Sequence, residues 1–184
     1  AGNIALGQVT AGTTATMTAS AGSITDNNGD STNNVTATTL VASAQDLVGD
    51  ANNDILLNSG DTNFDALETA VTNLTVTTTA ADADIAIDNS KGSTLTVDAV
   101  TPSSGQDATM WIRNDNGVTV TNWTLDGNDN LALIATSGNV TIPNDNYAGS
   151  AGTAETGVID ANGNLENADI SVGTGQVRLE AAAG

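Results

Sequence analysis

The chain has 184 residues, with 22 acidic and three basic side chains and a formal net charge of −19, so the phosphates of nucleic acids and anionic lipids would be repelled. It contains no cysteine and no histidine, which excludes disulfide-stapled scaffolds, thiol-ligated metal sites and catalysis by the commonest general base. Aromatic residues make up only 2% and hydrophobic residues 39%, and small aliphatic side chains suit a narrow core between closely stacked strands. No apolar run approaches the ~18 residues of a membrane span, so we expect no part of the chain to be embedded in a membrane.

The first fifty residues contain short runs in which apolar and polar residues alternate, the period of a half-buried strand. A turn-rich break follows at Asp26–Asp30. Residues 50–65 are the least regular, with one apolar island at Ile55–Leu57, and we interpret them as an excursion from the regular pattern. The strands expected before residue 50 are 4–6, 15–19, 22–25, 34–38, 39–43 and 46–49.

One helical signal follows the excursion. Asp65 could cap a helix with Glu68 three positions later, and Leu67, Ala70 and Val71 have helical spacing. The segment is too short to stand alone as a helix. We therefore predict a single helical turn that leads into a strand.

The next stretch, residues 66–101, repeats one unit: a short strand, a turn and another short strand, without a helix between them. The strands are predicted at 73–77, 84–88 and 94–98, with turn-forming clusters at 80–83 and 89–92. After Pro102 the same pattern returns, interrupted by a polar loop from Pro143 to Thr156. The strands expected there are 109–113, 117–121, 123–125, 130–134, 138–142, 157–159, 168–172 and 176–179.

Strands this short at 8–12-residue spacing also suit a β-sandwich. A solenoid is favoured because Asn-Gly hairpin turns are scarce, the apolar residues are small, and one motif recurs as GNIAL at Gly2, GNVTI at Gly138 and GNLEN at Gly163. We predict an all-β fold, a parallel β-helix (β-solenoid) with roughly 20–25 residues per coil and on the order of eight coils. Residues 1–184 then form a single β-solenoid segment, expected to belong to a longer repeat protein or fibre, because both ends interrupt a strand pattern.

Three segments, GNIALGQVTAGTTATMTASAGSITDNNG, LETAVTNLTVTTTAADADIAIDNSKGSTLTV and GQVRLEAAAG, resemble the repeat regions of very large bacterial surface adhesins. These are the filamentous-haemagglutinin-like and related β-strand-repeat proteins, and the resemblance covers nearly the whole chain. It implies a right-handed parallel β-helix that is exported and displayed at the cell surface as a stalk or fibre. It implies no particular ligand.

The candidate catalytic residues are carboxylates. Asp82, Asp84 and Asp88 share strand parity, and neighbours two apart would sit about 6.5–7 Å from one another, which could suit glycoside hydrolysis. The inward face there belongs to Ile85 and Ile87, so we expect these acids to point to solvent, where nothing raises a pKa. The prediction is that the chain is not an enzyme and has no catalytic residues.

Three oxygen-rich loops resemble the start of a calcium loop: Asp26–Asp30, Asp126–Asn130 and Asp160–Asn164. None carries the bidentate Glu at its far end, and the repeated GGxGxD signature of calcium-bound β-rolls is missing. Turn chemistry explains these loops, so we expect no cofactor and no metal site, with Ca²⁺ as the alternative.

Trp111 and Trp123 would serve either as a sugar-stacking platform, or to cap the core or pack together on adjacent coils, and we favour this packing role. Asn34, Asn73, Asn122 and Asn139 begin N-glycosylation patterns that a chain rich in Asn and Thr shows by chance. Lyases that act on acidic polysaccharides need basic residues, and this chain offers only three: Lys91, Arg113 and Arg178.

We therefore predict a structural stalk or fibre segment of a secreted or cell-surface bacterial adhesin, with an extracellular location. Its expected partners are neighbouring repeats or a second copy, meeting end to end through the coils of Ile4 and Leu179, and surface glycans or the surface of a host or partner cell. The alternative is a carbohydrate-binding or carbohydrate-active β-helix module.

Overall fold

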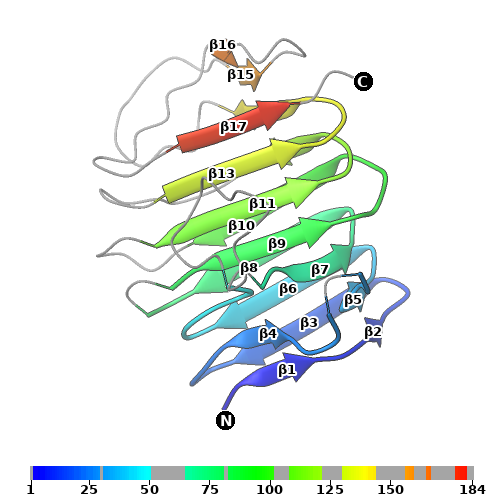
Figure 1. Cartoon of the computed structure of the whole chain (residues 1–184), viewed down its shortest axis with the longest axis vertical. Coiled ribbons are helices and arrows are strands. Elements are labelled where there is room, and N and C mark those ends of the chain that lie inside the picture. The colour runs from blue at the N-terminus through cyan, green and yellow to red at the C-terminus, as the bar shows by residue number, and fades with distance from the viewer. Residues whose placement is uncertain are drawn as a thin grey trace.

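The computed structural model describes residues 2–29, 31–50, 65–80, 83–101, 108–121, 130–143, 156–159, 165–166 and 177–181. The regular elements of this described part are all β-strands, most of them in parallel sheets, so the all-β prediction is confirmed. The strands lie one above another along the longest axis of the molecule (Figure 1). In chain order they are β1 (Ile4–Leu6), β2 (Val9–Thr10), β3 (Thr14–Ala19), β4 (Ile24–Asp26), β5 (Val35–Thr36), β6 (Thr39–Ala44), β7 (Leu67–Ala70), β8 (Asn73–Thr78), β9 (Ile85–Asn89), β10 (Leu95–Thr101), β11 (Thr109–Asn114), β12 (Val118–Val120), β13 (Asn130–Ala135), β14 (Val140–Pro143), β15 (Thr156–Ile159), β16 (Leu165–Glu166) and β17 (Val177–Ala181).

Two large sheets contain most of these strands. Sheet A has the order β17-β13-β11-β9-β7-β5-β2, and sheet B has the order β16-β15-β14-β12-β10-β8-β6-β3. A separate pair, β1-β4, continues through single bridges from Ile24 to Val48 and from Val48 to Ile85 on β9. From β6 to β14 the chain passes alternately between the sheets, so each sheet receives every second strand. This alternation is compatible with a β-solenoid.

Register supports the predicted length of the repeat. Ile4 pairs with Ile24, twenty residues later, and Val9 pairs with Val35, twenty-six residues later. The strands pair in parallel except in β14-β15-β16, where both pairings are antiparallel. The parallel stacking therefore ends in sheet B at β14, within the described residues.

The hydrophobic core lies between the facing sheets. The six residues of β3 alternate between exposed and buried, because successive side chains of a strand point to opposite faces. Inward positions repeat from strand to strand in register, apart from a shift between Val97 and Ala99 where β10 pairs with β8, and this repetition produces rows of aliphatic side chains. One row in sheet B is Leu40, Leu74 and Val97, and one row in sheet A is Leu67, Ile87, Ile112, Leu133 and Leu179. The expected inward placement of Ile85 and Ile87 is confirmed, since both are completely buried.

The predicted helical turn at residues 65–68 is wrong. Leu67–Ala70 is strand β7, and Leu67 pairs in parallel with Ile87. A one-turn helix gains little hydrogen bonding for the residues it orders, whereas the ladder to β9 supplies partners and buries Leu67 completely. Tertiary pairing overrides the local capping signal.

The excursion predicted at residues 50–65 is closed at its base by an antiparallel bridge between Asp50 and Asp65, with N···O distances of 2.8 and 3.0 Å. Its interior, 51–64, lies outside the described residues, as do the strands expected at 123–125 and 168–172. Leu40 pairs with Leu74, thirty-four residues later, so the register step across the excursion is longer than the step of twenty-five residues from Ala15 to Leu40 before it and the step of twenty-three residues from Leu74 to Val97 after it. This extra length is what an insertion between two coils produces.

Candidate functional site

The outer face of sheet A carries most of the candidate functional side chains of the described residues. Strand register forms two outward rows there, with side chains that the sequence separates by about 20 to 50 residues. The first row is Ala86, Trp111, Ala132 and Arg178, and the second is Glu68, Asp88, Arg113, Ile134 and Glu180. Two of the chain's three basic side chains thus share a face with Trp111.

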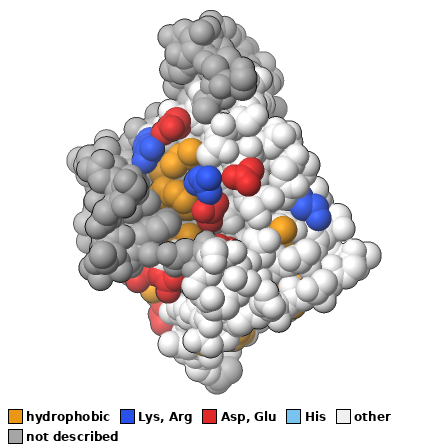
Figure 2. Space-filling view, turned by 45° about the vertical axis from the view of Figure 1, so that its right-hand side comes forward, with side chains coloured by type: hydrophobic (Ala, Val, Ile, Leu, Met, Phe, Trp, Pro, Cys, Tyr) orange, Lys and Arg blue, Asp and Glu red, His pale blue; other side chains and the backbone are white. Residues whose placement is uncertain are grey.

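Trp111 belongs to a second apolar cluster that is separate from the core between the sheets. This cluster contains Ala66, Ala86, Trp111, Ala132 and Ile134. Figure 2 shows orange side chains on this face, bordered by two basic groups that each touch an acidic one. The Trp111 side chain is only 5% exposed, which leaves its ring faces little access to a sugar. Trp111 is therefore a buried packing residue, but of this outer cluster and not of the core between the sheets. Trp123 lies outside the described residues.

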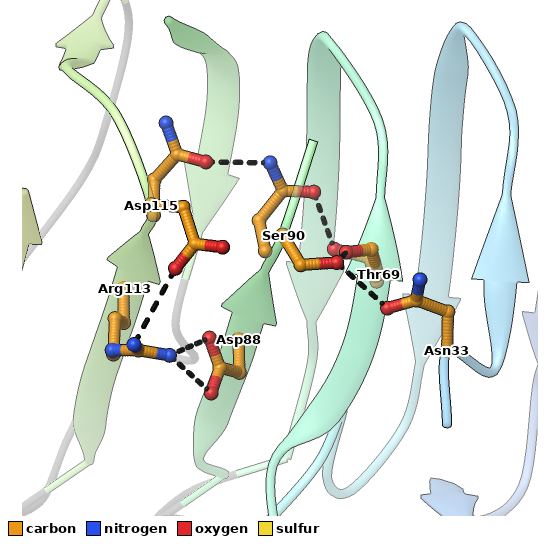
Figure 3. Close-up of polar contacts among 8 residues, drawn as sticks. Asn33, Thr69, Asp88, Ser90, Arg113 and Asp115 are labelled. Atoms are coloured by element: carbon orange, nitrogen blue, oxygen red, sulfur yellow. Dashed lines mark hydrogen bonds and ion pairs between the residues drawn. The ribbon is translucent and has the colours of Figure 1, made fainter. Parts of the chain in front are cut away.

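The Arg113 guanidinium is held by two carboxylates. Its Nη1 donates to both oxygens of Asp88 at 2.6 and 2.7 Å, and its Nη2 lies 3.4 Å from Asp115 Oδ1 (Figure 3). On β17, Arg178 Nη2 donates to Glu180 Oε2 at 2.6 Å. Both guanidinium groups are about one-third exposed, so these pairs stabilise the fold by about 1 kcal/mol or less each. The two arginines neutralise acids of their own face, a use that competes with binding an acidic substrate.

The expectation that the three acids point to solvent is wrong for Asp84 and incomplete for Asp88. Asp84 is only 4% exposed, and its Oδ1 accepts a hydrogen bond of 2.9 Å from the Thr109 backbone N–H. Strand parity does place Asp84 on the outer side of sheet A, but a side chain on that side is not necessarily exposed to solvent, because the same side carries the apolar cluster. Burial raises the pKa of the Asp88 carboxyl above its ordinary value, and the charge of Arg113 offsets part of this effect. Asp82 lies outside the described residues.

The first of the three oxygen-rich loops is a hydrogen-bonded turn. The Asp26 carboxylate accepts from the backbone N–H groups of Asn28 and Gly29 at 2.8 and 2.9 Å, and also from Asn34 Nδ2. Although burial acts to raise the pKa of Asp26, these donors together hold it below its ordinary value. Among the described residues, the groups that contact this carboxylate are hydrogen-bond donors. The described residues contain no cluster of three potential metal ligands, and nearly all of the loops at 126–130 and 160–164 lies outside them.

Sequence reasoning missed a row of buried polar side chains at one corner between the sheets: Asn34, Thr69, Asn89 and Asn114, all completely buried. Asn89 Nδ2 donates to Asn114 Oδ1 at 2.7 Å, and Thr69 Oγ1 donates to Asn89 Oδ1 at 2.8 Å (Figure 3). A signal was available, since IAIDN and MWIRN each end an apolar strand with Asn at the same register position.

These amides satisfy the backbone where the chain turns from one sheet to the other. Asn89 Oδ1 accepts from Val71 N, and its Nδ2 donates to Val71 O. Asn114 Nδ2 donates to the carbonyls of Ser93 and Gly117 at 2.9 and 2.7 Å. The row replaces water as the hydrogen-bond partner of buried turns, so its role is structural. Asn34, which begins one glycosylation pattern, is inaccessible in this arrangement.

The fold defines the class as an all-β protein of two facing, mainly parallel sheets. No family model matches the chain, and neither the curated proteins nor the solved structures include a significant match. Within the described residues, no helix is long and apolar enough to cross a membrane.

Proposed function

We propose that the chain is a right-handed parallel β-helix that serves as a structural stalk or fibre segment of a secreted or cell-surface bacterial adhesin. The observation that carries this proposal is the uninterrupted row of inward aliphatic side chains, from Leu67 on β7 to Leu179 on β17. A stack of this kind lengthens by adding coils, because each coil contacts mainly its neighbours. Its function is then to hold other regions at a distance.

Two further features support a scaffold. The buried amide row at Asn89 and Asn114 uses polar side chains to secure turns, and the Arg113 and Arg178 guanidinium groups are paired within their own face. The net charge of −19 keeps a repetitive sheet protein soluble and opposes non-specific edge pairing. No catalytic step follows from these arrangements.

Location tests the proposal. Antibodies raised against the folded chain should label intact cells of the source organism, and permeabilisation should add little further signal. Trypsin added to intact cells should remove the label only slowly, because a stacked sheet exposes few cleavable segments and the chain has three basic residues. Labelling seen only after permeabilisation would exclude a surface stalk.

Carbohydrate binding is the alternative, and it rests on Trp111 sharing a face with Arg113 and Arg178. Because Trp111 is 5% exposed, we expect a glycan screen to show no binding. A glycan that binds the native chain and loses affinity in Trp111→Ala, with the fold retained, would establish the alternative and remove the passive scaffold.

A further inference from the structure

The outer face of sheet B is a regular array of threonine side chains. Strand register aligns its outward positions in three rows, and the first row crosses six strands from β3 to β14. The rows are Thr14, Thr39, Asn73, Thr96, Thr119 and Thr141; Thr16, Val41 and Thr75; and Thr18, Ser43 and Thr77. Nine of these twelve side chains are threonine and none is charged, although the chain has a net charge of −19.

Strand propensity alone does not explain this face. Threonine is enriched in strands generally, so propensity alone would place it on the outer faces of both sheets. The two outward rows of sheet A that contain Trp111 and Arg113 hold nine residues, and none of the nine is threonine. Five of them are charged: Glu68, Asp88, Arg113, Arg178 and Glu180. The fold therefore separates a charged outer surface on sheet A from an uncharged, threonine-rich surface on sheet B.

The threonine hydroxyls of this face are available to solvent. Thr14, Thr16 and Thr18 are exposed, and the threonines of the following strands are half-buried between their neighbours. Within the described residues, the hydroxyls of the nine row threonines make no hydrogen bond inside the chain. By contrast, the hydroxyls of Thr72 before β8 and Thr121 after β12 donate to backbone carbonyls at 2.8 and 3.0 Å. The rows therefore present methyl groups and unused hydroxyls side by side.

The array has two regular repeats. Neighbouring strands lie ~4.8 Å apart, and alternate residues of one strand lie ~6.7 Å apart, so the first row spans about 24 Å. The strands of the stack follow one another at nearly the same inclination in Figure 1, which keeps the rows nearly straight. All three rows run without a break from β3 to β8. The register shift between Val97 and Ala99 then interrupts the second and third rows, where Asp98 is exposed.

A grid of this kind is similar to the surface lattice of ice, whose oxygen atoms repeat at comparable distances along two perpendicular axes. Hydroxyls on the grid can donate to and accept from lattice water, and the methyl groups between them order the water nearby. Threonine is stiff at χ1, so the array loses little conformational freedom when it meets a rigid lattice. Charged groups would hold hydration shells that interrupt the lattice, and the three rows contain none.

We propose that the outer face of sheet B binds ice. The rows from Thr14 to Thr141 adsorb to a face of an ice crystal and hinder its growth there. The ligand is the ordered water of the crystal surface, and further coils at either end of the stack would lengthen the same rows. This activity goes beyond the proposed scaffold function and does not require it.

Ice grown slowly from a solution of the chain tests the proposal. We expect the wild-type chain to become enriched in the ice, to shape the crystals into facets and to lower the freezing point below the melting point. The double variant Thr39→Tyr, Thr75→Tyr raises two rings above the plane of the hydroxyls and should lose all three effects. Thr10→Tyr is the matched control and should keep them, because Thr10 is exposed on β2 of sheet A, outside the rows.

A second variant tests the role of charge. Thr75→Asp changes the side-chain volume little but introduces a carboxylate in the middle row, and it should also lose the enrichment in ice. Circular dichroism and thermal unfolding establish that each variant keeps the stack, so a loss of ice binding is not a loss of fold.

Three results would overturn the proposal. The first is a wild-type chain that is excluded from ice and leaves the crystals unshaped. The second is a folded Thr39→Tyr, Thr75→Tyr variant that is as active as Thr10→Tyr. The third is binding to crystalline cellulose or chitin without any effect on ice, which would assign the face to a flat polysaccharide. Each result leaves the scaffold function in place, because labelling of intact cells tests that function separately.

Discussion

Removing the Asn89 side chain should cost more stability than removing any exposed polar group. Asn89 makes four hydrogen bonds of 2.7 to 3.1 Å while completely buried: with Val71 N, Val71 O, Thr69 Oγ1 and Asn114 Oδ1. Each bond stabilises the fold by roughly 0.5–1.5 kcal/mol, and each buried partner left unsatisfied costs about 1–3 kcal/mol. Because the partners can relax towards one another, we expect Asn89→Ala to lower the free energy of unfolding by about 3–5 kcal/mol.

Urea unfolding followed by circular dichroism measures this loss. Asn33→Ala is the matched control, since Asn33 makes one exposed hydrogen bond of 3.0 Å with the Ser90 hydroxyl, and its loss should change stability by about 0.5 kcal/mol or less. Asn89→Asp keeps the volume and the acceptors but cannot donate, so it should also be strongly destabilising. If Asn89→Ala lost no more than Asn33→Ala, the buried row would not secure the turns and the reasoning would be refuted.

Three further outcomes follow from single positions. Gly49→Ala should lose at least about 2 kcal/mol of stability in thermal or urea unfolding, because φ is +68° and a Cβ would lie 2.2 Å from Ala86 O. Gly92→Ala is the control and should lose less, because Gly92 has φ +69° but lies in open space. Equal losses would contradict the close approach at Gly49. Because the pKa of Asp26 is lowered on folding, its carboxylate contributes stability at pH values above its ordinary pKa of 3.8, and this contribution is lost as the pH falls through the folded pKa. The stability advantage of wild type over Asp26→Asn should therefore shrink on acidification. A difference that stays constant with pH would contradict this. NMR titration should show the Asp88 carboxyl titrating above 3.8, since burial outweighs its arginine partner, and a lower pKa would contradict that balance.

Alternation of apolar and polar residues was enough to predict most of the strands, although it missed the two-residue strands β2 and β16. The strand at Leu95–Thr101 follows directly from the run 94–98, because strand parity depends only on local sequence. The helical turn at 65–68 failed because pairing of Leu67 with Ile87 is a contact between residues twenty positions apart. The local capping pattern gives no information about the free energy of such a long-range pairing.

The candidate site was harder to predict, because it depends on register. Asp88 and Arg113 are twenty-five residues apart in sequence, and only the parallel pairing of β9 with β11 places them side by side. Asp84 was expected in solvent, since parity gives the face of a side chain but not what covers that face. The buried row of Asn89 and Asn114 has the same origin, and equal positions at the ends of two strands become a contact only when the strands stack.

The most direct test of the stacked architecture is a series of distances along one outward row of sheet B. Thr14, Thr39, Asn73, Thr96, Thr119 and Thr141 follow one another in register. Spin labels at Thr14→Cys with Thr119→Cys and at Thr14→Cys with Thr141→Cys, diluted with unlabelled chain, should give about 19 and 24 Å, because each strand adds ~4.8 Å. Distances that fail to increase by one strand spacing, or that place residue 141 nearer to residue 14 than residue 119, would contradict a parallel stack and the scaffold function proposed for it.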